Sequence, residues 1–200
     1  MNDLPEDISE LKFFQKGTYK IKYYSSIGST NDAAKEIAKK GNANGLVIIA
    51  DSQAMGRGRS DHTWFSPSGV NIYLSIIYDL NTNINESLIN TLNIEISQAI
   101  CTAIFKTSML QAYCRAPNDI YYDNKKLGGV LIESLVCGQS IRYIVVGIGL
   151  NVNVKKGDFP VEIQDRATSI LIETGKIINR GSLICALLNE LKACISFILI

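Results

Sequence analysis

The sequence predicts an α+β domain in which a mixed sheet carries helices packed on one face. The first supporting observation is that segments with the apolar spacing of helices separate groups of strand-like segments. The second is that short polar turns join the later strands, as in antiparallel hairpins. The third is a hydrophobic content of 46% over 200 residues, which suits a single domain with a sizeable core.

The N-terminal part of the chain is predicted to contain a strand, a helix and two further strands. Residues 19–28 have a strand pattern that ends in a loop. Ser29 or Thr30 can cap the helix that follows, and Gly41 is a suitable C-terminal stop. The segments "GLVIIADSQ" and "NIYLSIIYDL" are short and apolar, which indicates buried strands.

The C-terminal part is predicted to contain two long helices with a group of strands between them. Apolar residues from Leu88 to Ala103 recur at helical spacing, with Asn85 as the cap. Three strand patterns follow, in "AYCRAPNDIYY", "KLGGVLIESLVC" and "SIRYIVVGIGLNVN". The last helix is expected to begin near Ser182.

Composition and charge argue against several classes of function. The formal net charge is +1, whereas general nucleic-acid and membrane-surface binders carry a strong basic excess. Five scattered cysteines without a C-x-x-C pair predict free thiols in a reducing compartment, and a single histidine argues against a Cys/His metal site. Charged residues interrupt the apolar C-terminal segment, which predicts a packed helix and not a membrane span. We therefore expect a cytoplasmic protein that does not bind membranes.

Residues 51–64, "DSQAMGRGRSDHTW", form a polar, glycine-rich and cationic segment. Gly56 and Gly58 allow the backbone to approach a ligand closely. Arg57 and Arg59 add forked donors that suit phosphate or carboxylate. Because like charges repel and glycine costs entropy, we expect the segment to be poorly ordered when empty and ordered by an anion. The residues alone equally allow a solvated basic turn.

Further polar groups flank this segment in the sequence, although neither a Walker loop nor a dinucleotide fingerprint is present. "GSTN" at 28–31 offers hydroxyls and an amide at a helix N-terminus, for a ligand or for simple capping. Asn118 and Asp119 could hold a phosphate or Mg²⁺, or form an ordinary Asx turn. Lys126 precedes Gly128–Gly129 and could reach a ligand lying on bare backbone, or remain in solvent. The glycines of "GIGLNVN" could simply mark a tightly packed strand end.

The order of these motifs is more specific than any one of them. "GSTN" is followed by "Q-x-x-GRGR-x-x-x-x-W-x-SP-x-G-x-N-x-Y-x-S", by "PND-x-Y-x-x-x-KKLGG-x-L-x-E" and by "G-x-G-x-N-x-N". This series resembles the biotin–protein ligases from about residue 25 to residue 153, and "ATSIL" at 167–171 extends the similarity.

The resemblance implies a catalytic core like that of the class II aminoacyl-tRNA synthetases. It also implies a ligase that joins biotin to ATP in the presence of Mg²⁺, releases pyrophosphate and forms biotinyl-5′-AMP. Biotin then passes to one lysine of a biotin carboxyl carrier domain. Because both nucleophiles belong to the substrates, such an enzyme needs no catalytic serine or cysteine and contributes mainly positioning and charge.

The resemblance further implies roles for individual residues. The implied biotin-binding residues are Ser29, Thr30, Asn31, Gln53, Gly56, Arg57, Gly58, Arg59, Lys126, Gly128 and Gly129. The implied ATP-binding residues are Arg59, Trp64, Asn118, Asp119 and Asn151. Asp119 would also be the metal ligand. The electrostatic catalysts would be Lys126, Arg59 and Arg57, with Lys126 as the main one.

The sequence departs from the family pattern in two places. The family commonly reads G-R-G-R-x-G-R-x-W, whereas Ser60, Asp61 and His62 follow Arg59 here. The usual K-W-P-N-D has become R-A-P-N-D, so that Ala116 replaces a tryptophan and is expected to leave a packing gap. We expect an active enzyme that binds ATP or biotin less tightly than a typical relative.

One catalytic domain is expected over residues 1–200, without a helix-turn-helix before residue 20 and with the family's small SH3-like C-terminal barrel absent or truncated. No DNA binding is therefore expected, while an exposed strand edge could serve a homodimer or the carrier. Two alternatives remain open. One is a lipoate or octanoate ligase or transferase on the same core, and the other is a non-catalytic homologue that holds biotin or a carrier domain.

Overall fold

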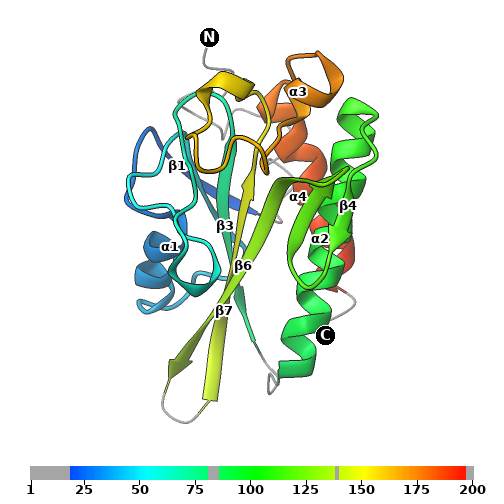
Figure 1. The fold of residues 1–200 in the computed structure, drawn as a ribbon. Helices are drawn as coiled ribbons and strands as arrows, with labels where there is room; N and C mark the ends of the chain where they lie inside the picture. The colour runs from blue at the N-terminus through cyan, green and yellow to red at the C-terminus, as the bar shows by residue number, and fades with distance from the viewer. Residues whose placement is uncertain (1–18, 81–85, 138–139, 197–200) are drawn as a thin grey trace.

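A computed structural model describes residues 19–80, 86–137 and 140–196 of the chain. Its centre is a seven-stranded mixed sheet with the order β1-β2-β3-β7-β6-β5-β4 (Figure 1). Strands β1 (Lys20–Tyr24) and β2 (Leu46–Ala50) pair in parallel, and the other neighbouring strands pair antiparallel. The predicted α+β class with a mixed sheet is confirmed.

The remaining strands form a series of hairpins that places β7 at the middle of the sheet. They are β3 (Ile72–Asp79), β4 (Tyr113–Arg115), β5 (Asp119–Tyr122), β6 (Lys125–Cys137) and β7 (Ser140–Leu150). The segment that was predicted as one strand around Pro117 is divided into β4 and β5. Proline cannot donate a ladder hydrogen bond, so the chain turns there instead of continuing.

The helices lie on both faces of the sheet (Figure 1). They are α1 (Thr30–Ala38), α2 (Glu86–Ser108), α3 (Ile170–Thr174) and α4 (Arg180–Ser196), with short 3₁₀ turns η3 (Arg59–Asp61) and η4 (Lys156–Asp158). As predicted, α2 and α4 pack together on one face. The structure differs from the expectation in that α1 covers the opposite face. Asn85, the predicted cap of α2, lies outside the described residues.

Strand β2 shows why both faces need cover. Val47 and Ile49 point into the main core beneath α2 and α4, whereas Ile48 points into a smaller cluster with Ala34 and Ala38 of α1. All five residues are buried. A strand that is apolar without alternation can be stable only when both of its faces are shielded from water.

One helical segment of the described chain, Ser87–Ser108, is long and apolar enough to cross a membrane by length and composition alone. Its buried residues contribute to the main core and contact α4 and the sheet; they include Leu92, Ile96, Ile100 and Ile104. A core helix passes the same test of length and composition. The expectation that the protein does not bind membranes stays a prediction.

Cys101, Cys114, Cys185 and Cys194 are free thiols. Burial raises the pKa of Cys101 to about 12 and that of Cys194 to about 11, and it also raises the pKa of Cys185. Because the thiolate is the reactive form, these three thiols are expected to react slowly with Ellman's reagent near neutral pH. No more than two of the five cysteines should react quickly before denaturation. Fast labelling of Cys101 in the folded protein, located by peptide mapping, would contradict this expectation.

Candidate functional site

A pocket of about 700 Å³ lies where the N-terminus of α1 and the loop after β2 meet strands β5, β6 and β7. It brings together most of the residues that the motifs singled out. They are Ser29, Thr30, Asn31, Gln53, Arg57, Gly58, Arg59, Trp64, Asn118, Asp119, Lys126, Gly129 and Asn151. Segments that are far apart in the sequence therefore share one wall.

Two of the predicted ligand-binding residues, Gly56 and Gly128, do not line the pocket. A Cβ on Gly56 would lie 2.5 Å from the Ser66 hydroxyl oxygen and 2.7 Å from the Trp64 carbonyl oxygen. A Cβ on Gly128 would lie 2.9 Å from the Gly149 carbonyl oxygen. Both glycines thus allow close packing inside the protein, and their contact with a ligand stays a prediction.

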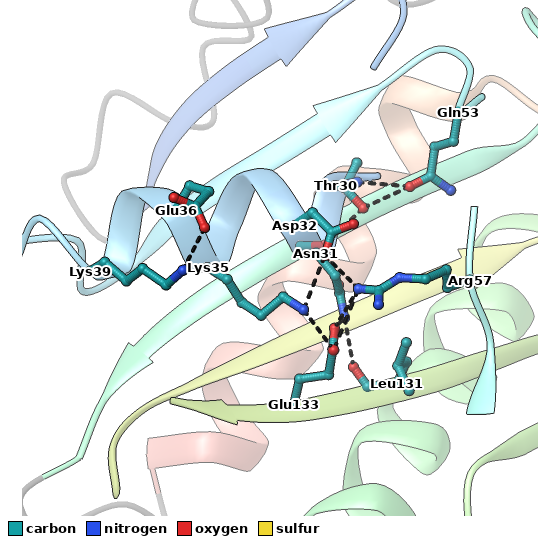
Figure 2. Close-up of polar contacts among 11 residues, drawn as sticks. Thr30, Asn31, Asp32, Lys35, Glu36, Lys39, Gln53, Arg57, Leu131 and Glu133 are labelled. Atoms are coloured by element: carbon teal, nitrogen blue, oxygen red, sulfur yellow. Dashed lines mark hydrogen bonds and ion pairs between the residues drawn. The ribbon is translucent and has the colours of Figure 1, made fainter. Parts of the chain in front are cut away.

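The N-terminus of α1 forms an uncharged polar corner of the pocket. The backbone N–H and the hydroxyl of Thr30 both donate to the side-chain oxygen of Gln53, over 2.8 and 3.1 Å (Figure 2). Ser29 caps the helix through its backbone carbonyl, and its hydroxyl makes no capping bond. Simple capping therefore does not account for this hydroxyl at the pocket wall.

Asn31 is nearly buried, and its amide already has protein partners. The side-chain N–H groups donate to the Leu131 carbonyl oxygen over 3.3 Å and to a Glu133 carboxylate oxygen over 2.8 Å (Figure 2). The Ser75 hydroxyl donates to the amide oxygen over 2.6 Å. Asn31 therefore attaches the start of α1 to the sheet; a ligand acceptor would have to replace one of its N–H bonds, whereas its amide oxygen has a second lone pair for a ligand donor.

Arg57 belongs to a cluster of four charged groups, which we call the counter-ion cluster: Asp32, Lys35, Arg57 and Glu133. The Arg57 guanidinium lies 2.5 Å from an Asp32 oxygen and 3.4 Å from a Glu133 oxygen (Figure 2). The Lys35 ammonium lies 3.0 Å from Asp32 and 2.8 Å from Glu133. Burial disfavours this ammonium, but the two carboxylates outweigh the effect and raise the pKa of Lys35.

The counter-ion cluster changes the expectation for the cationic loop, by which we mean residues 51–64. Arg57 points to acidic groups of α1 and β6, whereas Arg59 donates to the Asn118 side-chain oxygen over 3.0 Å. The loop backbone closes on itself through Gly58 N–H to the His62 carbonyl and Trp64 N–H to the Gly56 carbonyl. The two arginines diverge, so the repulsion that predicted a poorly ordered empty loop is removed.

Lys126 and Asp119 form an ion pair in the pocket, with 2.7 Å between ammonium and carboxylate. The same ammonium lies 5.7 Å from the centre of the Trp64 ring. Asp119 is thus a single carboxylate that already has a cation beside it, and the described chain contains no group of three acidic, histidine or cysteine side chains that could hold a metal. These residues do not fit a Mg²⁺ held by the protein alone, so the metal role of Asp119 stays a prediction.

Gly147 and Gly149 of β7 are site residues that the sequence analysis left as packing glycines. A Cβ on Gly147 would collide with the Asn31 amide, and one on Gly149 would lie 2.5 Å from the Trp64 ring. The available signal was their i, i+2 spacing in a strand, which places both on one face. Arg166 also lines the pocket and was missed, although it directly precedes the "ATSIL" motif.

The departures from the family pattern lie at the surface of the site. His62 is exposed and lines the pocket beside Ser60, which has a left-handed backbone conformation with φ of 53°. Ala116 is exposed in the turn between β4 and β5. The packing gap that was expected at Ala116 is therefore not a cavity in the core.

The contact between Gly149 and Trp64 can be tested with the only tryptophan of the chain as a reporter. Gly149→Ala should displace the Trp64 ring, shift its emission to longer wavelength and lower the free energy of unfolding by about 1–3 kcal/mol, as in other overpacked sites. Gly157→Ala is the matched control, because nothing lies within 4 Å of the added methyl group. Identical emission from both variants would contradict the placement of Trp64.

Comparisons with known proteins identify the family of the chain. The family model described as "Biotin/lipoate A/B protein ligase family" matches residues 23–151. The bifunctional ligase/repressor BirA of Bacillus subtilis is 33% identical over 180 residues, covering 88% of this chain and 54% of the relative. BirA of Escherichia coli is 31% identical over 152 residues, covering 76% and 46%. The chain thus spans about half the length of these curated relatives.

Among solved structures, the biotin protein ligase from Aquifex aeolicus in complex with biotin and ATP superposes with a TM-score of 0.74 at 28% identity. The match covers 88% of this chain and 70% of that one. The matched family region runs from β1 to the end of β7 and so includes α1, the cationic loop and the strands that line the pocket. The chain belongs to the biotin/lipoate A/B protein ligase family.

Proposed function

We propose that this chain is the catalytic domain of a biotin–protein ligase. It would activate biotin with ATP as biotinyl-5′-AMP and then transfer biotin to a lysine of a biotin carboxyl carrier domain. The observation that carries the proposal is the combination of two kinds of group in one pocket. Ser29, Thr30 and Gln53 offer uncharged hydrogen-bonding groups that suit a ureido ring, whereas Arg59 and Lys126 offer cations that suit a carboxylate and phosphates.

The chemistry explains why cations are needed. Biotin's carboxylate and ATP are both anions, and their approach is opposed until positive groups offset the repulsion. A carboxylate oxygen then attacks the α-phosphorus, and pyrophosphate leaves. In the second step the neutral amine of the carrier lysine attacks the acyl carbon, AMP leaves, and the amine loses a proton as the amide forms.

The cations of the pocket differ in how much of their charge is already paired. Arg59 has an amide partner, and within residues 19–80, 86–137 and 140–196 it has no ion pair with a carboxylate. Lys126 is paired with Asp119, so it would exchange one carboxylate for the anionic substrates. Arg57 would do the same only by leaving Asp32 and Glu133. We therefore assign the main electrostatic work to Arg59 and Lys126.

The nucleotide would lie on the Trp64 side of the pocket. Trp64 provides an aromatic surface suited to a purine, and Asn151 lines the same pocket with its side-chain oxygen 3.4 Å from the Asn71 amide nitrogen. Mg²⁺ would reach the site with the triphosphate, since a metal ion of this kind keeps substrate phosphates and water among its ligands.

The proposal includes a macromolecular partner and a cellular setting. The carrier domain of a biotin-dependent carboxylase would be the acceptor, in the cytoplasm, and the protein would bind neither DNA nor membranes. Strands β1 and β4 are the outer strands of the sheet. Such outer strands have backbone groups that can pair with the carrier or with a second copy of the chain. A single catalytic domain over residues 1–200 remains part of this proposal.

The nearest alternative is a ligase or transferase for lipoate or octanoate, because the matching family model covers both substrate classes. A non-catalytic homologue that holds biotin or a carrier is the second alternative. Exchange of labelled pyrophosphate into ATP, measured with biotin, with lipoate and without either acid, separates a biotin ligase from a lipoate ligase and from proteins that activate neither acid, namely an acyl transferase or a non-catalytic homologue. We expect biotin-dependent exchange; exchange that requires lipoate, or none with either acid, would overturn the proposal.

Variants of the two main cations test the electrostatic assignment. Lys126→Ala and Arg59→Ala should each lower the rate of biotin-dependent exchange about 10²–10³-fold, the range seen when one stabilising group is removed from an active site. Lys39→Ala is the matched control, because it removes the same charge from an exposed lysine that caps the C-terminal end of α1, pairs with Glu36 and does not line the pocket. Wild-type exchange in either pocket variant would contradict the assignment.

A further inference from the structure

Arg180, the first residue of α4, is a charged side chain with no exposed surface. One of its guanidinium nitrogens lies 2.8 Å from a carboxylate oxygen of Asp51 and donates to the Asn71 carbonyl oxygen over 3.1 Å. Asp51 is itself only 5% exposed. This ion pair lies outside the pocket, and α4 lies outside the matched family region of residues 23–151.

Two partners of Arg180, Asp51 and Asn71, lie at the two ends of one loop. We call residues 52–70, which connect β2 to β3, the site loop, because they carry Gln53, Arg57, Arg59 and Trp64. Asp51 directly precedes this loop, and Asn71 directly follows it. Arg180 therefore contacts both of its ends from a different part of the fold.

A second bond joins the ends to each other. The Ser68 hydroxyl donates to Oδ2 of Asp51, whereas the Arg180 nitrogen described above donates to Oδ1. Asn71 also continues the connection to the pocket, since its amide oxygen accepts from the Val152 N–H over 2.9 Å and its amide nitrogen lies 3.4 Å from the Asn151 side-chain oxygen. The path from α4 thus reaches a residue of the pocket wall.

We propose that Arg180 is a positioning residue, which fixes both ends of the site loop and, through Asn71, the pocket wall at Asn151. The role in catalysis rests on the proposed ligase function. The guanidinium is suited to this task because the two N–H groups of one nitrogen point in fixed directions, one toward each end of the loop, whereas the donors of a lysine ammonium rotate. Fixing the ends of a loop also reduces the conformations that its middle can sample.

Stability alone is a weak explanation for this pair. A buried ion pair can often be replaced by apolar residues without loss of stability, so its presence indicates a geometric requirement. The attachment of α4 does not depend on the pair either. Leu183, Ile184 and Leu187 are fully or almost fully buried in the main core, and Lys106 of α2 pairs with Glu190 of α4 over 2.6 Å.

The test compares Arg180→Lys with Glu190→Gln, both in the full chain and at a temperature where circular dichroism shows each variant folded. Arg180→Lys keeps the buried charge but loses the fixed directions of the planar N–H donors. It should increase acrylamide quenching of Trp64 and lower kcat/KM of biotin-dependent exchange about tenfold or more, since a small misplacement of a positioning element is costly. Glu190→Gln breaks another contact of α4 and should leave both readouts at wild-type values.

Ser68→Ala keeps the test decisive if Arg180→Lys does not fold. Ser68 is exposed, and the substitution removes only the bond between the loop ends. It should increase Trp64 quenching in the same direction, by a smaller factor. Wild-type quenching in Ser68→Ala, or equal effects of Arg180→Lys and Glu190→Gln, would overturn the proposal.

The two proposals can fail separately. Trp64 quenching needs no substrate, so a change in quenching without exchange activity in the wild type would leave the anchoring role intact and overturn the ligase function. If the wild-type protein catalyses biotin-dependent exchange and Arg180→Lys does not change its rate, the ligase function stands and the positioning role of Arg180 in catalysis is overturned.

Discussion

The close approach of side chains to the backbone of β7 is the constraint on which the pocket depends. Gly147 leaves room for the Asn31 amide, and Gly149 leaves room for the Trp64 ring. Because alternate residues of a strand share a face, these two gaps lie next to each other on the side of the sheet that α1 covers. The start of α1 and the end of the cationic loop can therefore rest on the same strand, and the groups they carry meet across one cavity.

Arg57 and Arg59 look equivalent in the sequence, but their different partners in the structure give them different roles. Arg57 is matched by Asp32 and Glu133, so it fixes the loop to α1 and β6. Arg59 meets only an amide among the described residues, so its charge remains to be balanced from within the pocket. A ligand anion binds more favourably to a cation that does not have to give up a carboxylate partner. Arg59 is therefore a stronger candidate for binding an anion than Arg57.

Much of the fold and most of the site could be predicted, and the failures have physical causes. The strand and helix segments followed from periodicity, and most of the site residues that the motif order named lie at the wall of one pocket. The partners of Arg57 could not be predicted, because Glu133 is 76 residues away and only the folded sheet brings it near. The position of α1 could in principle have been predicted, because β2 has apolar residues on both of its faces and therefore needs a helix on each side of the sheet. Arg180 gave no signal, because a lone arginine at a helix start is normally exposed.

The middle position of β7 has a consequence for how the protein is made. This strand lies between β3, which precedes it by some sixty residues, and β6, and it carries the glycines on which the pocket rests. During synthesis β1, β2 and β3 leave the ribosome well before it, with an apolar edge that has no neighbour. The nascent chain thus stays vulnerable to aggregation until about residue 150 emerges, and a chaperone that shields β3 in that interval would raise the yield of native protein.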